Sequence, residues 1–271
     1  MQTKDRLSFP FSRSSAIIAG FGFFLLYAPI AALVWGSFVP GVLISGSGAS
    51  GGLTLEWYRR LFADPAILEA FEVSWVVGFW STLGATFLGT SAALALSWGH
   101  FPGKKAFSIL TYVPLVLPEI VLGLALLTWF VLLNLTLGLV SVILAHITFS
   151  TSYVLMTVKT RLDGFDGALL EAARDLGASP WQSFWRVTFP LILPGITSGA
   201  LMAFTLSFDD FLITYFTAGS GSDTLPLKIY SMIKFGVTPE INALSTLMVA
   251  VTWVAVSLFF GPMRRRGSTL T

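Results

Sequence analysis

The chain has no cysteine and few charged residues. Without cysteine among its 271 residues, disulfides, thiolate chemistry and cysteine-ligated metal sites are excluded. Charged residues make up 11% of the chain, whereas soluble domains usually carry about 25%. The net charge of +2 is too small to indicate a nucleic-acid partner. Because 55% of the residues are hydrophobic, the composition predicts an integral membrane protein.

Short motifs that carry enzymatic chemistry are also missing. The sequence has no GxxxxGK followed by serine or threonine, so we do not expect this chain to bind and hydrolyse ATP by itself. HExxH does not occur either. The chain is therefore not expected to be an enzyme or to hold a cofactor or metal of its own.

Long apolar runs are what the sequence does contain. A hydrocarbon core of about 30 Å needs roughly 20 apolar residues as helix. This length predicts one all-α transmembrane domain, residues 1–271, with six spans at about 16–38, 68–98, 106–133, 137–158, 191–216 and 241–261. The outer loops are then residues 39–67 and 217–240, and a short interfacial helix is expected near 55–62, where apolar residues repeat at helical spacing.

Lysine and arginine set the predicted orientation, because loops on the cytoplasmic side carry an excess of them. With six spans, twelve of the 16 basic residues fall on one side: Lys4, Arg6, Arg13, Lys104, Lys105, Lys159, Arg161, Arg174, Arg186, Arg264, Arg265 and Arg266. Both termini and the polar segment 159–190 are therefore expected in the cytoplasm.

The polar segment 159–190 is predicted to be a hairpin of two short helices. Apolar residues at helical spacing mark the first helix, and Gly177 is where it should stop, because glycine adopts the left-handed conformation of a C-terminal cap. Ser179 and Gln182 form a capping-box pattern, and Pro180 suits the first helical position. We expect Pro190 and Pro194 to separate the second helix from the next span.

Three carboxylates stand out within the predicted spans, where ionisable groups are costly and are functional candidates by default. Glu119 follows Pro118, whose missing N–H frees a carbonyl that is tolerated where it faces protein or water. Asp209 and Asp210 lie in the outer part of the fifth span. No lysine or arginine lies in a span as a partner, so the carboxylates favour a cationic cargo.

Other readings of these polar residues stay open. Glu119 could be a protonated or hydrogen-bonded packing residue, and only one of two adjacent aspartates can face a given direction. His146 is expected to hydrogen-bond a neighbouring helix rather than to bind a metal, since no second ligand stands three or four residues away. Tyr153 and Tyr215 are candidates for contact with a cation through the ring face.

The hairpin carries a family signature. Glu171-Ala172-Ala173, three residues, Gly177, nine residues and then Val187-Thr188-Phe189-Pro190 resembles the EAA-x3-G-x9-I-x-LP signature of binding-protein-dependent ABC importer permeases. Val187 and Phe189 depart mildly from the isoleucine and leucine of that pattern. The resemblance implies a type I permease fold in which this coupling hairpin docks on a cytoplasmic ATPase through Glu171, Ala172, Ala173 and Gly177.

Nearly the whole chain after residue 16 is similar to the spermidine/putrescine permeases of the second membrane-subunit (C/I) subfamily. The similarity rests on YVPLVLPEIVLGLALL, LAHITFSTSYV, EAARDLGASPW, FTLSFDDFLITYF and TLPLKIYSMIKFGVTPEINALSTL. It implies a polyamine cargo, which the carboxylates Glu119, Asp209 and Asp210 would suit; Tyr153 and Tyr215 are further candidates along the pathway.

The same resemblance implies partners and a location. A sister permease would complete the pathway, two ATPase subunits would bind ATP and Mg, and a periplasmic or lipid-anchored binding protein would dock on the outer loops, all at the bacterial inner membrane. The alternatives are a permease for another small solute such as an amino-acid derivative, a self-sufficient secondary transporter or channel, and a non-transporting scaffold.

Overall fold

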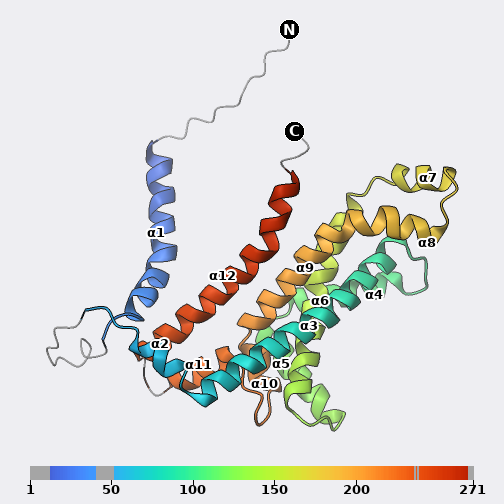
Figure 1. Ribbon diagram of the computed structural model, residues 1–271. Coiled ribbons are helices and arrows are strands. Elements are labelled where there is room, and N and C mark those ends of the chain that lie inside the picture. The colour runs from blue at the N-terminus through green and yellow to red at the C-terminus, as the bar shows by residue number, and fades with distance from the viewer. Residues whose placement is uncertain (1–12, 41–51, 235, 237, 268–271) are drawn as a thin grey trace.

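The computed structural model describes residues 13–40, 52–234, 236 and 238–267, and every regular element in these ranges is a helix (Figure 1). Residues 41–51 of the first outer loop, and Lys4 and Arg6 of the predicted basic flank, lie outside the described residues. The elements are α1 (Arg13–Gly36), α2 (Glu56–Leu61), α3 (Pro65–Trp98), α4 (Lys104–Val116), α5 (Glu119–Leu132), α6 (Leu139–Asp163), α7 (Ala168–Asp175), α8 (Pro180–Ser183), a π-helical turn (Phe184–Thr188), α9 (Phe189–Asp209), α10 (Leu212–Thr217), α11 (Leu225–Ile233) and α12 (Pro239–Gly267).

Helices α3, α6 and α9 pack against one another and form the core. Buried aliphatic side chains from all three meet there, among them Ala85, Val154, Val158 and Ala203. Small residues let the backbones approach, as is usual where helices pack within a membrane. A Cβ on Gly89 would lie 2.7 Å from Val154 Cβ and 2.9 Å from the Thr151 carbonyl oxygen.

This close approach predicts that Gly89→Leu destabilises the folded protein by about 1–3 kcal/mol, the usual cost of overpacking a core. The backbone carbonyl of Thr151 cannot move aside without bending α6. Gly20→Leu is the matched control, because a Cβ there meets nothing within 4 Å. The thermal midpoint in detergent should fall for the first variant and not for the second; equal midpoints would contradict the packing account.

Four helical stretches among the described residues are long and apolar enough to cross a membrane: Ser15–Gly36, Pro65–Trp98, Leu139–Asp163 and Pro180–Asp209. The bent pair α4 and α5 adds a fifth if it is counted as one span. Large apolar side chains such as Leu26 and Phe87, 70% and 71% exposed, cover the outside of these helices. Such a surface suits lipid or a partner chain rather than water.

The predicted third span, 106–133, is not one continuous helix. It divides into α4 and α5, whose axes bend by 117° at Leu117 and Pro118. Leu117 is extended, with ψ 137°, because the residue before a proline is disfavoured in the helical region. Pro118 then supplies no N–H to continue the helix.

The fifth predicted span, 191–216, also differs from expectation. Its helix ends at Asp209, Asp210 is extended, and the short helix α10 begins at Leu212.

The beginning of this span differs as well. We expected Pro190 and Pro194 to end the second hairpin helix, and this expectation is wrong. Helical backbone runs from Pro180 to Asp209, and the π-helical turn at 184–188 ends two residues before Pro190, which has no N–H to donate to a regular helical bond.

The helix ends divide between two ends of the molecule. Helix α1 begins and α12 ends at the same end of the molecule as α7 and α8, while α2, α10 and α11 gather at the opposite end (Figure 1). The short helix expected near 55–62 is α2, and it packs against α12 at that opposite end.

Candidate functional site

The hairpin between α6 and α9 is held by local caps. Gly177 has φ +81°, and its N–H donates to the Arg174 carbonyl at 2.9 Å, while the Ala178 N–H donates to the Ala173 carbonyl at 3.0 Å. These two bonds form a Schellman motif, the C-terminal cap that favours glycine. The predicted stop at Gly177 is confirmed, and the spacing between the Glu-Ala-Ala triplet and the glycine is the spacing that this cap requires.

The second half of the hairpin begins with the predicted capping box. Ser179 Oγ accepts from the Gln182 N–H at 3.3 Å, and Gln182 Oε1 accepts from the Ser179 N–H at 3.0 Å. Two large apolar side chains stand out from the turn, Leu176 at 89% exposed and Trp181 at 71%. Glu171 and Ala172 are exposed and Ala173 is half-buried, so the hairpin presents a mixed apolar and acidic surface.

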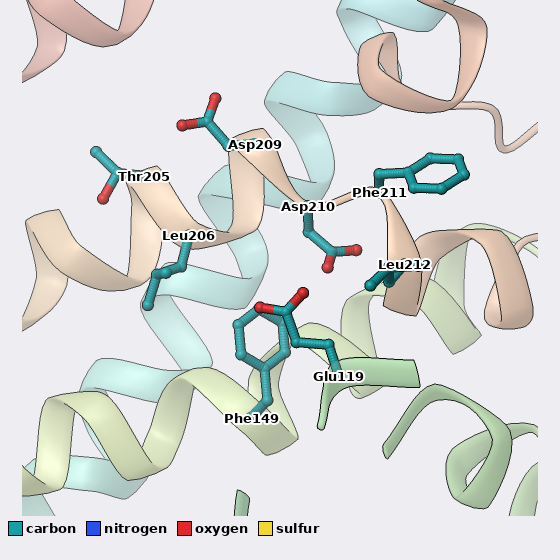
Figure 2. A pocket seen from close by; sticks show the side chains of 8 residues that line it. All are labelled: Glu119, Phe149, Thr205, Leu206, Asp209, Asp210, Phe211 and Leu212. Carbon is teal, nitrogen blue, oxygen red and sulfur yellow. The ribbon is translucent and has the colours of Figure 1, made fainter. Parts of the chain in front are cut away.

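The two helix breaks meet at one cavity. It has a volume of about 300 Å³ and is lined by Glu119, Phe149, Thr205, Leu206, Asp209, Asp210, Phe211 and Leu212 (Figure 2). Glu119 is the first residue of α5, directly after one break, and the two aspartates stand at the other. Helix α10 packs against α5, which brings the two breaks together. The three carboxylates predicted from the sequence therefore border the same cavity.

Their side chains point in different directions. The carboxylates of Glu119 and Asp210 point toward one another, whereas that of Asp209 points away (Figure 2). Asp209 is exposed and also lines a second cavity of about 270 Å³ against α12, which Thr252 borders as well. This bears out the expectation that adjacent aspartates cannot face the same way.

Asp210 is buried and caps α10. Its Oδ2 accepts from the Thr214 N–H at 2.8 Å and from the Thr214 hydroxyl at 3.0 Å, and its Oδ1 accepts from the Ile213 N–H at 3.3 Å. His146 Nε2 lies 3.3 Å from Oδ2. The carboxylate thus satisfies N–H groups that the first turn of a helix leaves without partners.

Neither candidate tyrosine lines the cavity, but each contacts the ring of a phenylalanine that lines it. Tyr153 is half-buried and meets Phe149 edge-on, with ring centroids 6.4 Å apart. Tyr215 is exposed and lies 5.6 Å from the Phe211 ring. The two tyrosines therefore contact aromatic side chains of the cavity wall without lining it.

Sequence reasoning missed the link between His146 and Asp210. The expectation that His146 hydrogen-bonds neighbouring helices is confirmed, since Nδ1 lies 2.7 Å from Ser207 Oγ and Nε2 lies 3.0 Å from Thr214 Oγ1. The available signal was the spacing of Ser207, Asp210 and Thr214, which helical geometry places near one face. The break at Asp210 could not be read from that spacing.

These features define a helical membrane protein with a capped hairpin at one end and an acidic cavity between broken helices. Residues 85–265 match the family model of the binding-protein-dependent transport system inner membrane component. The chain belongs to this family and is a permease of the type I ABC importer class.

Curated relatives cover most of the chain. The putrescine transport system permease protein PotI of Escherichia coli (strain K12) is 39% identical over 245 residues, 88% of this chain and 86% of PotI. The spermidine/putrescine transport system permease protein PotC of Haemophilus influenzae is 40% identical over 234 residues, 86% of this chain and 90% of PotC.

Solved structures share the fold at lower identity. A chain of a bacterial ABC transporter involved in the import of the acidic polysaccharide alginate superposes with a TM-score of 0.72 at 16% identity, covering 93% of this chain and 94% of that one. A chain of an amino acid ABC transporter gives 0.61 at 17% identity, covering 79% and 100%. The helical fold that this chain shares with these structures covers 93% and 79% of its length.

Proposed function

We propose that this chain is one of two membrane subunits of an ATP-driven importer of polyamines such as putrescine and spermidine. The observation that carries the proposal is the gathering of Glu119, Asp209 and Asp210 around one cavity whose described lining holds no lysine or arginine. A polyamine is a flexible chain with several ammonium groups, and carboxylates and aromatic faces are the groups that bind such cations. Relatives at 39% and 40% identity that carry putrescine or spermidine in their names support this substrate class.

The proposal includes six crossings of the inner membrane with both termini in the cytoplasm. The crossings are α1, α3, the bent pair α4 and α5, α6, the stretch that ends with α9, and α12, which contains the predicted span 241–261. Support comes from the common end at which α1 begins, α12 ends and the hairpin lies (Figure 1). It also comes from the lysines and arginines, most of which lie in the termini and in the loops predicted to be on the same side as the hairpin.

In this proposal the hairpin is the contact with the ATPase. Glu171, Ala172, Ala173 and Gly177 belong to a capped unit whose apolar side chains Leu176 and Trp181 are largely exposed, as a docking surface requires. Two ATPase subunits, which bind ATP and Mg, would move this unit and the sister subunit's equivalent. Since the backbone is helical from Pro180 to Asp209, movement of α8 is transmitted along α9 to the cavity.

The remaining partners follow from the shape of the path. One chain provides one wall of the acidic cavity, so a sister permease is needed to enclose it. A binding protein, periplasmic or lipid-anchored, would deliver substrate at the outer loops 39–67 and 217–240. Cargo must bind the carboxylates weakly enough to be released, which suits an open cavity.

Copurification from native membrane tests the proposal. The chain should bring down a sister permease and an ATPase, and the ATPase activity of the assembly should rise when the binding protein is loaded with putrescine. Stimulation by an amino-acid derivative and not by polyamines would replace the substrate. Uptake by this chain alone, without an ATPase, would instead indicate a secondary transporter.

A further inference from the structure

A buried chain of polar side chains connects the core to the cavity. It runs from Ser81 on α3 through Ser207 on α9 and His146 on α6 to Asp210 and Thr214 at the second break. Ser81 Oγ lies 2.8 Å from Ser207 Oγ, and Ser207 Oγ lies 2.7 Å from His146 Nδ1. His146, Ser81 and Thr214 are 0% exposed. Buried polar groups that all find partners fix their elements in one arrangement.

Counting hydrogens assigns the proton on His146. The single hydroxyl hydrogen of Thr214 is donated to Asp210 Oδ2, so Thr214 can only accept from the imidazole. Nε2 must therefore carry a hydrogen. Nε2 lies 3.0 Å from Thr214 Oγ1 and 3.3 Å from Asp210 Oδ2. Nδ1 then faces Ser207, whose hydroxyl can donate to it while accepting from Ser81; the Ser81 hydroxyl also lies 3.3 Å from the Gly78 carbonyl oxygen.

The imidazole is thus what holds the Asp210 carboxylate from the core side. The backbone N–H groups of Ile213 and Thr214 hold it from the side of α10. A buried carboxylate with only part of its partners is expensive, so removing the imidazole N–H should loosen the cap.

The cap in turn controls both walls of the cavity. Leu212 and Phe211, which line it, belong to the segment that Asp210 caps. Helix α10 packs closely on α5, since a Cβ on Gly123 would lie 2.7 Å from the Phe216 ring and 3.5 Å from the Leu212 carbonyl oxygen. Glu119 begins α5, so the position of its carboxylate depends on where α10 lies.

We propose that His146 is a positioning residue, whose Nε2–H holds the Asp210 carboxylate in the cap of α10 and thereby fixes the cavity between the two broken helices. Asp210 then serves first as a structural carboxylate, and Glu119 and Asp209 are the carboxylates left to face cargo. The consequence for transport rests on the proposed function, whereas the positioning itself does not.

Two amide substitutions separate this role from a general need for polarity. The amide nitrogen of glutamine can take the place of Nε2 as a donor, and the amide oxygen of asparagine can take the place of Nδ1 as an acceptor. His146→Gln should therefore keep the bond to Asp210 and Thr214, and His146→Asn should keep only the contact with Ser207. A residue that merely fills the core would not distinguish the two.

The absence of native cysteine allows a direct readout of cavity geometry. Leu212→Cys places one thiol of this chain in the cavity wall, and its modification by a small cationic methanethiosulfonate is measured on this chain in the assembled complex in membrane vesicles. With His146→Asn the rate should change by about tenfold or more, in line with the loss of a charge-assisted hydrogen bond, whereas His146→Gln should stay near the parent. In uptake assays, the KM for putrescine should shift in the asparagine variant and return toward the parent value in the glutamine variant.

Thr214→Val provides a second test if the His146 variants do not accumulate. It removes a hydroxyl that both donates to Asp210 and accepts from the imidazole, and it should also change the labelling rate. Thr148→Val is its control, because the Thr148 hydroxyl is exposed and donates within α6 to the Leu144 carbonyl at 2.8 Å. Parent-like labelling with both His146→Asn and Thr214→Val would overturn the proposal. A changed labelling rate without any putrescine uptake in the parent would support the positioning role and contradict the proposed substrate.

Discussion

Gly177→Pro is expected to lower ATP-driven uptake by about tenfold or more, because proline fixes φ near −65° and has no N–H. Gly177 has φ +81° and donates to the Arg174 carbonyl, so the substitution removes both the turn and one of its two cap bonds. The path of the chain from α7 into α8 would change, and with it the surface offered to the ATPase. The cores formed by α3, α6 and α9 do not involve this turn, so the protein should still insert in the membrane.

Gly177→Asn is the matched control. Asparagine keeps the N–H and adopts the left-handed conformation more readily than other residues with a Cβ, and a Cβ at this position meets nothing within 4 Å. Uptake, substrate-stimulated ATP hydrolysis and copurification of the ATPase should all fall with proline and largely survive with asparagine. A bulky residue at half-buried Ala173 should likewise uncouple transport. Survival of both activities with proline would show that the hairpin does not couple the subunits.

Glu119→Gln is expected to raise the KM for putrescine uptake by about tenfold, the value of one charge-assisted hydrogen bond of about 1.4 kcal/mol or more. The Glu119 side chain is exposed at the cavity, and its carboxylate points toward that of Asp210 (Figure 2). Glutamine keeps the size and a hydrogen-bonding group but cannot attract an ammonium group by charge. Asp209→Asn should act in the same direction, since Asp209 borders the same cavity.

The control for this prediction is Glu72→Gln, which removes a carboxylate from an exposed position on α3 outside the cavity lining. Initial rates of labelled putrescine uptake over a range of concentrations measure KM and maximal rate for each variant. Amounts of assembled complex should be equal in all three. An unchanged KM in both cavity variants would remove Glu119 and Asp209 from the pathway.

The hairpin could be predicted closely from sequence because its signals are local. Gly177, Ser179, Pro180 and Gln182 each act on backbone groups a few residues away, and the structure shows the caps that these residues form. The π-helical turn before Pro190 was missed, because a proline after a polar segment is compatible both with a new helix and with a continued one.

The breaks in the membrane helices were harder to predict. Hydrophobicity gives the length of a span and not its straightness, so 106–133 was expected to be one helix although Pro118 signalled a weak point. At the second break, Asp210 lies beside His146, which is 64 positions away in the sequence. Tertiary partners of this kind leave no local pattern.

Sequence reasoning identified the carboxylates of the cavity by the free-energy cost of placing a charged group in a membrane span, and not by their geometry. Charged groups are expensive in a span, which singled out Glu119, Asp209 and Asp210 before any arrangement was known. Their different roles depend on direction, and Figure 2 shows Asp209 turned away from the other two. Only the fold shows that Asp210 is engaged in a cap and that Glu119 stands open to the cavity.

Uptake in reconstituted vesicles tests the central claim most directly. The purified assembly is placed in proteoliposomes with ATP at the ATPase side and the binding protein with labelled putrescine at the other, and accumulated label is measured over time. The account predicts accumulation that requires ATP, the binding protein and an intact Gly177 turn, and that unlabelled spermidine suppresses. Accumulation without ATP or without the ATPase subunits, or an assembly that transports only neutral or anionic solutes, would contradict it.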